Sequence, residues 1–412
     1  MKLEIDRHRL LAEIEALAVF SDAEAPAVTR IVFTPTDLKA RAWMKARCEE
    51  AGLTVRYDAI GNTFARWNGT DPAAPVVGTG SHIDAIPNAG KYDGVVGVLG
   101  GLEAIRALRR GGFRPQNSIE LLVFTAEEPT RFGIGCLGSR LLSGTLATDA
   151  ARKLTDRSGA TIDEVRSGAG FAGDLERVTL PSGYYKAFVE FHIEQGPLLE
   201  REQIPLGVVT KIAAPASLRV FIEGAGGHAG GVLMPDRHDA LCAAAELILA
   251  IENAALASGA SDTVATVGIC EVFPGAVNSI PSQVRLTVDI RDTDLNRRDA
   301  AMQALDAAAG AISAKRQVSI RTELLNADAP GDCAPIVIEA LSQACKKHGL
   351  DFKTMVSRAY HDSLFIGRIA SVAMLFIPCR NGYSHRPDEY ASPDDIVRGT
   401  LVLAETLAAL SA

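Results

Sequence analysis

Histidine and acidic residues gather in four short clusters, and each cluster lies beside a predicted strand end or a glycine-rich turn. The clusters are Gly80–Asp84, Lys91–Gly97, Thr125–Pro129, and a fourth in two parts, Glu190–Gly196 and Asn381–His385. Imidazole nitrogens and carboxylate oxygens bind divalent transition metals, and two ions about 3.5–4 Å apart can share one carboxylate. The inventory therefore predicts a dinuclear metal site that serves hydrolysis.

The first cluster places His82 directly after Pro75–Ser81, a segment that predicts a short buried strand. A histidine at this point is directed at the mouth of the sheet. Asp84, two residues on, can accept the second imidazole N–H and so fix the ring for metal binding. A structural histidine, hydrogen-bonded at the strand end, is the alternative that this cluster alone leaves open.

The next two clusters supply carboxylates. Asp93 precedes a helix predicted over about 94–109, where it could bind metal or simply cap the helix. Glu127 and Glu128 close an apolar strand predicted over 118–125. Adjacent carboxylates at a buried strand end need a cation or a proton, and their side chains point to opposite sides. One can bind metal while the other acts as general base, but the residues do not decide which; a solvated acidic turn is the alternative.

The fourth cluster adds two histidines. His192 follows an alternating run that contains Phe188 and Glu190, and His385 lies in a turn after an apolar strand predicted over 372–377. Each histidine is a weak signal alone. Together with the carboxylates, they complete a ligand inventory for two ions at the mouth of one sheet.

The elements that must position these residues alternate between short apolar strands and helices in the first half of the chain, and again near its end. This alternation predicts an α/β fold with a central mixed sheet covered by helices on both faces. In such a fold, functional residues gather beyond the carboxyl ends of the strands.

The middle of the chain has a different pattern. Residues 217–223 and 284–291 alternate strictly between apolar and polar side chains, which is typical of a sheet with one covered face. Helices predicted over 240–251 and about 296–313 would cover that face, so we expect an inserted α+β domain with a small antiparallel sheet. The expected organisation is a catalytic domain over 1–213 and 329–412, interrupted by the inserted domain over 214–328.

Bulk composition narrows the class of partner. The 412-residue chain has a formal net charge of -8, which argues against a nucleic-acid partner, because neutralising phosphates needs a basic face. Seven scattered cysteines without a C-x-x-C pair fit reduced thiols in a cytoplasm. The N-terminus lacks the pattern of a signal peptide, and no uninterrupted run of about 18 apolar residues occurs, so we expect a cytoplasmic protein without a membrane span.

In this order, the clusters resemble those of the metal-dependent aminoacylase and carboxypeptidase-G type hydrolases. They are most similar to the carbamoyl-amidohydrolase branch, which comprises N-carbamoyl-L-amino-acid hydrolase, β-ureidopropionase, allantoate amidohydrolase and ureidoglycolate amidohydrolase. The resemblance runs from about Gly80 to Tyr390. It rests on the motifs GSHIDAIPNAGKYDGVVGVLGGLEA, EEPTRFGIGCLGSR, EFHIEQG, GGHAGG, PGAVNSIP, DIRD and NGYSHRPDE, all in family order.

The resemblance implies a ligand set for two divalent ions, which could be Zn, Mn, Co or Ni. The ligands of the first ion would be His82, Asp93 and His192. The second ion would share Asp93 and add Glu128 and His385.

The catalytic residues follow from the same resemblance. Glu127 would be the general base that takes a proton from the metal-bridging water and later protonates the leaving nitrogen. Asp84 would support the site beside His82. His228, in the motif GGHAGG, matches the family's lid histidine, which polarises the scissile carbonyl; a loop histidine with no task is the alternative.

The inserted domain is a lid and dimerisation domain in this family, so the resemblance also implies a homodimer. Asn278 and Arg291 match residues that hold the substrate's carboxylate, while Gln195 matches a contact to the ureido end and Gly382 a position in the substrate site. Arg291 lies on the polar side of its alternating strand, where it can present a two-pronged guanidinium; a surface salt bridge is the alternative. His361 is expected to have a structural role.

The sequence around Pro129 resembles the ureidoglycolate amidohydrolase version, whereas many carbamoylases have glycine there. We therefore expect a small carboxylate-bearing ureido acid as substrate, either ureidoglycolate or an N-carbamoyl-L-amino acid, whose C–N cleavage releases ammonia and carbon dioxide. One alternative is an N-acyl-amino-acid hydrolase or peptidase of the same fold. A metal-less binding relative is the alternative from a different class, and it would have lost at least one ligand.

Overall fold

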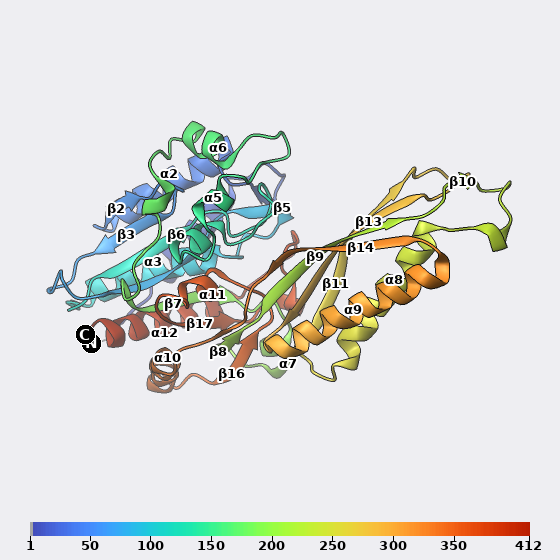
Figure 1. Ribbon diagram of the computed structural model, residues 1–412. Helices are drawn as coiled ribbons and strands as arrows, with labels where there is room; N and C mark the ends of the chain where they lie inside the picture. Colours follow the sequence, from blue (N-terminus) through green and yellow to red (C-terminus); the bar gives the residue numbers. More distant parts are fainter. Residues whose placement is uncertain (1–2) are drawn as a thin grey trace. The chain divides into compact units, whose positions relative to one another are not determined.

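The computed structural model describes residues 3–412, which form two compact units (Figure 1). Unit 1 comprises Met1–Thr210, Asp332–Met355 and His361–Ala412, and unit 2 comprises Lys211–Gly331 and Val356–Tyr360. The expected boundaries after 213 and 328 compare with 210 and 331. The segment Val356–Tyr360, expected in the catalytic domain, groups with unit 2 instead, where Arg358 forms an ion pair with Asp262 at 2.6 Å.

Unit 1 is built on a nine-stranded mixed sheet, as the alternation of elements predicts. Its strand order is β15-β8-β17-β7-β4-β6-β3-β2, and β16 pairs with β8. The strands are β2 (Thr54–Tyr57), β3 (Thr63–Trp67), β4 (Val76–His82), β6 (Ile119–Phe124), β7 (Tyr185–Ile193), β8 (Leu206–Ile212), β15 (Gly331–Asp332), β16 (Phe352–Ser357) and β17 (Ser371–Ile377). A separate pair joins β1 (Val28–Arg30) to β5 (Ala85–Ala89).

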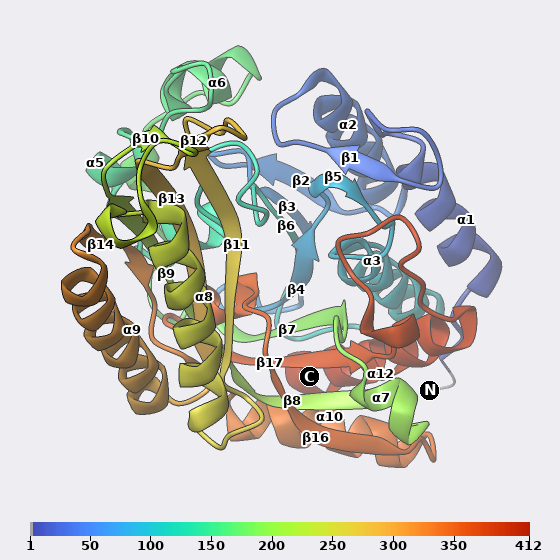
Figure 2. The same ribbon diagram turned by 90° about the vertical axis from the view of Figure 1, so that its right-hand side faces the viewer.

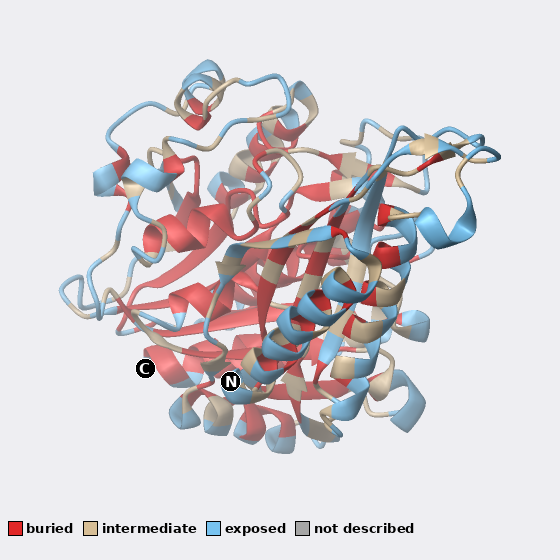
Figure 3. Ribbon diagram, turned by 45° about the vertical axis from the view of Figure 1, so that its right-hand side comes forward, coloured by how far each residue is buried: buried red, intermediate tan, exposed pale blue. Residues whose placement is uncertain are grey.

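Helices cover both faces of this sheet. One layer contains α1 (Arg7–Ala18), α3 (Val95–Arg110), α10 (Pro335–Lys347) and α12 (Pro393–Ser411), which pack on one another and on the central strands. The opposite side holds a core that includes Phe124 and Phe188 and is covered by α4 (Leu137–Leu142), α5 (Thr148–Ala151), α6 (Ile162–Gly168) and α11 (Asp362–Ile366). The remaining helices are α2 (Pro35–Glu50), beside β2 and β3, and α7 (Leu198–Glu202). Figure 3 shows the central strands buried almost throughout.

Four neighbouring strands of the sheet, β17, β7, β4 and β6, run parallel. Their carboxyl ends therefore meet at one edge, with His82 opposite Phe124 and His192 opposite Phe376 in the register. Parallel strands that are buried on both faces read as apolar runs, which is why the sequence pattern identified them. The edge at which they end is where ligands bind in sheets of this kind.

Unit 2 contains a four-stranded antiparallel sheet with the order β11-β13-β9-β14. The strands are β9 (Ala214–Glu223), β11 (Val264–Phe273), β13 (Gln283–Asp292) and β14 (Ser319–Ala327). Helices α8 (Ala240–Ala257) and α9 (Leu295–Arg316) lie side by side on one face (Figure 2). A short pair, β10 (Gly227–His228) with β12 (Ser279–Ile280), completes the unit. The predicted α+β layer is confirmed.

Helix α8 is long and apolar enough to cross a membrane by length and composition, although the sequence analysis expected no such segment. The expectation rested on an uninterrupted apolar run, which Glu246 and Glu252 break, whereas the average hydropathy of the helix still qualifies. In the structure, Leu247 and Ile251 pack into the core of unit 2. Core helices of this kind meet the same length and composition test.

Candidate metal centre

The carboxyl ends of the parallel strands bring the predicted ligands together in unit 1. His82 is the last residue of β4 and His192 the penultimate residue of β7. Glu128 follows β6, and His385 lies in the loop after β17. Asp93 precedes α3, whose N-cap is Gly94 with no side-chain capping bond, so Asp93 is not a helix cap.

The ligand atoms form two groups that share Asp93. Asp93 Oδ1 lies 3.1 Å from His192 Nε2 and 3.5 Å from His82 Nε2. Asp93 Oδ2 lies 3.2 Å from His385 Nε2, which is also 3.2 Å from Glu128 Oε1. Within each group the donor atoms lie within 4.8 Å of one another. One carboxylate thus faces a different set of ligands with each oxygen, which is the arrangement that a shared carboxylate needs.

Backbone carbonyls orient the two buried histidines. His82 Nδ1 lies 3.0 Å from the carbonyl oxygen of Asp84, and His192 Nδ1 lies 2.9 Å from that of Ile193. A carbonyl oxygen accepts the N–H of Nδ1, which leaves Nε2 of each ring on the side of Asp93, where, once unprotonated, it can offer its lone pair to a metal ion. The donor set therefore fits divalent metal ions.

The expected role of the Asp84 carboxylate was only partly correct. Its Oδ1 lies 3.7 Å from His82 Nδ1, farther than the Asp84 carbonyl oxygen. The carboxylate instead accepts the backbone N–H of Glu128 at 3.1 Å and that of Glu127 at 3.4 Å. Because those two residues lie in a tight turn, with φ of 53° at Ala126, the donors point back at Asp84. Asp84 thus fixes the turn that carries both glutamates.

The two glutamates are buried, which excludes the solvated acidic turn. Glu127 is 8% exposed and Glu128 4%. Glu127 Oε2 lies 3.7 Å from His82 Nε2, and its Oε1 accepts a hydrogen bond from Cys136 Sγ at 3.3 Å. Burial, reinforced by the neighbouring carboxylates, raises the pKa of Glu127 to about 8. A carboxyl group with a pKa near neutrality can both accept and return a proton.

Charge in the metal-free site is balanced by the histidines. Burial lowers the pKa of His385, but hydrogen bonds to Asp93 and Glu128 outweigh it and raise that pKa to about 11. Opposed by burial, Glu127 and Asp93 raise the pKa of His82 well above its usual value. The same contacts overcome burial and hold the pKa of Asp93 well below its usual value. The negative charge of these buried carboxylates thus favours protonated histidines, and bound metal cations could neutralise the same charge.

Two glycines allow the backbone to approach closely at the site. Gly94 has a φ of 65°, and a Cβ there would lie 2.5 Å from the ring of His82. Gly382, which we expected in the substrate site, has a φ of 69°, and its Cβ would lie 2.7 Å from the backbone of Gly196. Gly382 therefore packs the loop of His385 against the segment that follows Gln195.

The sequence analysis missed two residues of the loop that carries His385. Ser384 donates to Asp93 Oδ2 at 2.8 Å or to Glu389 Oε2 at 2.9 Å. Glu389 accepts the backbone N–H groups of Tyr92 and Asp93 at 2.8 and 3.1 Å. The signal was their position in the motif NGYSHRPDE, directly before and four residues after His385.

Gln195 and His361, the other residues of unit 1 singled out in the sequence, each contact one of the proposed ligands. Gln195 Nε2 donates to Asp93 Oδ2 at 2.9 Å and to Ser384 Oγ at 3.2 Å. His361 is 2% exposed, and its ring meets the ring of His192 edge-on at 4.5 Å. That packing fits the structural role expected for His361.

The remaining candidates belong to unit 2. His228 is exposed on β10, and its neighbour Ala229 donates to the carbonyl oxygen of Asn278 at 2.9 Å, so His228 and Asn278 lie together. Arg291 forms an ion pair with Asp289 at 2.6 Å, and its guanidinium lies 5.3 Å from the centre of the Tyr360 ring. Asp289 is thus the salt-bridge partner that the surface alternative required.

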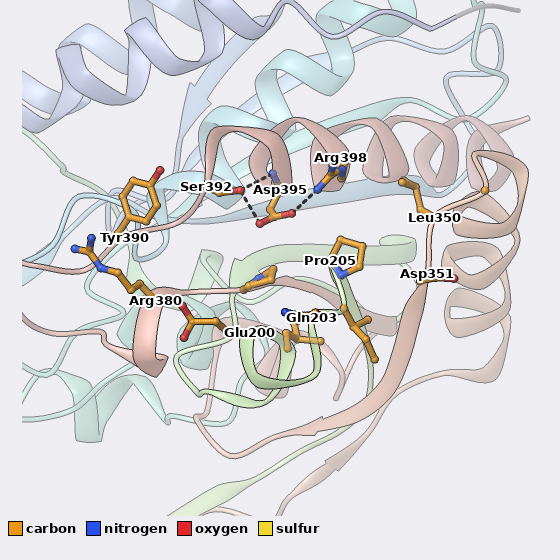
Figure 4. A pocket seen from close by; sticks show the side chains of 14 residues that line it. Glu200, Gln203, Pro205, Leu350, Asp351, Arg380, Tyr390, Ser392, Asp395 and Arg398 are labelled. Carbon is orange, nitrogen blue, oxygen red and sulfur yellow. Dashed lines mark hydrogen bonds and ion pairs between the residues drawn. The ribbon is translucent and has the colours of Figure 1, made fainter.

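Unit 1 has a cavity of about 550 Å³, and Figure 4 shows the side chains that line it. Glu200, Arg380 and Tyr390 line it, and none of its lining residues belongs to the two ligand groups. Within this lining, Arg398 forms an ion pair with Asp395 at 2.9 Å. The cavity is therefore separate from the metal centre.

Comparison with known proteins shows the family of the chain. The model of the Peptidase family M20/M25/M40 matches residues 78–409. The chain is 52% identical over 416 residues to a ureidoglycolate hydrolase of Arabidopsis thaliana, covering 99% of this chain and 87% of the relative. It is 37% identical over 405 residues to an N-carbamoyl-L-amino-acid amidohydrolase of Pseudomonas sp. (strain NS671), covering 98% of both chains.

A solved structure shows the same fold. The crystal structure of AtUAH in complex with glyoxylate matches with a TM-score of 0.94 and 51% identity, covering 99% of this chain and 98% of that one. The resemblance inferred from the sequence motifs is thereby confirmed. The chain belongs to the M20/M25/M40 peptidase family, as a relative of its ureidoglycolate and N-carbamoyl-amino-acid hydrolases.

Proposed function

We propose that this protein hydrolyses the C–N bond of ureidoglycolate with the help of two divalent metal ions. The observation that carries the proposal is the position of Asp93 between two ligand groups, with the buried Glu127 beside His82. Such an arrangement serves hydrolysis of an unactivated amide or ureido bond. The 52% identity to a ureidoglycolate hydrolase and the sequence around Pro129 favour this substrate.

The residues of unit 1 divide the chemistry between them. Two ions of Zn, Mn, Co or Ni, held by the five ligands, would lower the pKa of water and polarise the substrate carbonyl. Glu127 accepts the proton of the attacking water and returns it to the leaving nitrogen. Asp84 keeps the turn of Glu127 and Glu128 in place. The products include ammonia and carbon dioxide.

The substrate contacts in this proposal are the residues that the family resemblance assigns. His228 stabilises the developing oxyanion, while Asn278 and Arg291 hold the substrate's carboxylate. Arg291 must exchange its ion pair with Asp289 for the ligand, or bind it with the donors that Asp289 leaves. Gln195, which already reaches Asp93 and Ser384, lies where it can contact the ureido end.

The test is ammonia release by the metal-reconstituted protein from ureidoglycolate, allantoate, N-carbamoyl-L-amino acids, N-carbamoyl-β-alanine and N-acetyl amino acids. We expect ammonia from ureidoglycolate, lost with a chelator and regained with Mn or Zn. Ammonia from an N-carbamoyl-L-amino acid alone would move the substrate assignment to that branch. Turnover of N-acetyl compounds alone, without ammonia, would refute the ureidohydrolase and make the protein an aminoacylase.

We further propose that the protein is a homodimer joined through unit 2 and works in the cytoplasm. Leu249 and Leu256 on α8 are 58% and 72% exposed, and Ile269 and Phe273 on the edge strand β11 are 51% and 61% exposed. An exposed apolar edge is covered in stable proteins, and a second copy related by a two-fold axis would cover it with the same surface. Seven free cysteines fit a reducing compartment.

A further inference from the structure

The loop of His385 is attached to Asp93 by a second contact, through the hydroxyl of Ser384. Ser384 Oγ lies 2.8 Å from Asp93 Oδ2 and 2.9 Å from Glu389 Oε2. A serine hydroxyl has one proton, so it can donate to only one of these two carboxylate oxygens at a time. The Ser384 oxygen itself accepts a hydrogen bond from Gln195 Nε2 at 3.2 Å. Ser384 is therefore a hydroxyl with two competing acceptors.

The second acceptor is fixed in place. Glu389 is 5% exposed, and its Oε1 accepts the N–H groups of Tyr92 at 2.8 Å and Asp93 at 3.1 Å. The other oxygen, Oε2, faces Ser384. Glu389 thus holds the backbone of the bridging ligand with one oxygen and offers the other to the hydroxyl.

We propose that Ser384 and Glu389 act together as a positioning switch for Asp93. Without metal, the hydroxyl donates to Asp93 Oδ2 and holds that oxygen toward His385. Rotation about the Cβ–Oγ bond turns the same proton to Glu389 Oε2, which frees a lone pair of Asp93 Oδ2 for a cation. No hydrogen bond of Ser384 is lost in the exchange, so cation binding at Oδ2 carries no cost of an unpaired hydroxyl.

The proposed switch predicts how the hydrogen bonds of Ser384 change in Glu389→Gln. In this variant, the side-chain oxygen of the glutamine must accept the N–H groups of Tyr92 and Asp93. If the amide were flipped, its NH₂ group would face these two N–H groups, and no hydrogen bond could form. The amide nitrogen then faces Ser384 and donates to it. The Ser384 proton is left with Asp93 Oδ2 as its only carboxylate acceptor, where it competes with the cation.

The inference rests on the proposed dinuclear site, and its test measures metal binding. The chelator-stripped full-length chain is titrated with Mn²⁺ or Zn²⁺ in competition with a chromogenic chelator. We expect Glu389→Gln to weaken the second ion about tenfold or more, which corresponds to about 1.4 kcal/mol, within the range for a charged hydrogen-bond partner. Ser384→Ala in the Glu389→Gln background should regain part of that affinity, whereas Ser384→Ala alone should leave affinity nearly unchanged, because the wild-type hydroxyl keeps a hydrogen bond with or without the ion.

The gain of affinity in the Glu389→Gln background, against little change in the wild-type background, separates the switch from simple loss of charge. If Glu389 acts only as a negative charge, Ser384→Ala will not restore affinity in the Glu389→Gln background, and the inference is overturned. Ser384→Thr in the Glu389→Gln background keeps the hydroxyl, so the proposal expects it not to restore affinity. Glu200→Gln is the matched control, since Glu200 accepts the backbone N–H of Asn381 in the same loop and its side chain lines the separate cavity (Figure 4).

Thermal unfolding of each metal-free variant, measured first, identifies any that fails to fold. If Glu389→Gln does not fold, Glu389→Asp takes its place. It should also weaken binding of the second ion, because the shorter carboxylate cannot reach both Ser384 and the backbone of Asp93. Unchanged affinity in a folded Glu389→Asp chain would count against the switch. Wild-type protein that binds fewer than two ions would refute the proposed site itself, so the two failures are distinguishable.

Discussion

The carboxylate of Asp84 accepts the backbone N–H of Glu128, with 3.1 Å between Asp84 Oδ2 and the nitrogen. Asp84 lies two residues after His82, a metal-ligand candidate on β4, and its carboxylate holds the turn after β6 that carries the proposed base Glu127 and the proposed ligand Glu128. The contact links two neighbouring strand ends, so the separation of His82 from Glu127 depends on it.

Asp84→Ala should reduce turnover about 10–100-fold, the usual effect of removing a group that orients metal-site residues. It should also lower the free energy of unfolding by about 1–3 kcal/mol, because two buried N–H groups lose their acceptor. Asp84→Asn keeps one oxygen for the N–H of Glu128 and should do less harm. Steady-state kinetics and denaturant unfolding measure both effects, and equal, near-wild-type values for the two variants would contradict the role.

Glu127→Gln should lower turnover about 10²–10⁴-fold while both ions stay bound, since a general base contributes a factor of that size. Metal content is measured on the purified variant, and turnover by ammonia release. Glu128→Gln is the contrast: it removes a charged ligand near His385 and should lower the content or affinity of one ion. A fully metallated Glu127→Gln enzyme with near-wild-type turnover would refute the assignment of the base.

Metal binding should release protons. The pKa of His385 in the metal-free protein is about 11, so its Nε2 carries a proton at neutral pH that must leave before a metal binds there. Affinity should therefore rise with pH and fall on acidification, by about tenfold per unit for each proton released. Calorimetric titrations at one pH in two buffers of different ionisation enthalpy measure the protons directly. Heats that do not depend on the buffer would contradict the charged histidine.

Gly382→Ala should destabilise the protein more than Gly112→Ala. Both glycines have positive φ, 69° and 75°, so both variants carry the backbone penalty of about 1 kcal/mol or more. Only the Cβ at 382 would meet other atoms within 4 Å, at 2.7 Å from Gly196. Gly382→Ala should also weaken the second metal ion, because His385 lies on the same loop. Equal unfolding free energies for the two variants would show that the loop yields without cost.

Leu249→Glu should convert the proposed dimer into monomers. The side chain is 58% exposed on α8, and a charge within a covered apolar surface would have to be buried unpaired. Light scattering after size exclusion, at micromolar concentration, gives the mass. Val19→Glu is the control, an apolar residue of unit 1 with 79% exposure that should leave the mass unchanged. A wild-type protein that is monomeric and fully active would refute the dimer.

The sequence was most informative where one local pattern decides one element. Buried parallel strands such as β4 and β6 read as apolar runs, and the alternation in β9 and β13 identified the covered face of unit 2. It could not show what the Asp84 carboxylate binds, because its partner is a backbone N–H 44 residues away. Glu389 was missed for the same reason: its contacts are backbone N–H groups at 92 and 93, and backbone donors have no sequence signature.

Other features depended on context beyond any one segment. The residues alone did not decide between Glu127 and Glu128, because their difference lies in what faces them, His82 in one case and His385 in the other. Val356–Tyr360 belongs to unit 2, where Arg358 contacts Asp262, 96 residues earlier in the chain, and no local periodicity encodes such a contact.

Strand β17 lies between β7 and β8 in the sheet but is made late, near the end of the chain, so the sheet cannot be complete until that part of the chain has been synthesised. A chain still attached to the ribosome, and ending before residue 371, lacks an interior strand and the histidine that follows it. Its sheet is split into two open edges, which are sites of misassembly. We therefore expect a chain that ends before residue 371 to lack His385 of the second ligand group and to expose the edges of β7 and β8 that β17 covers.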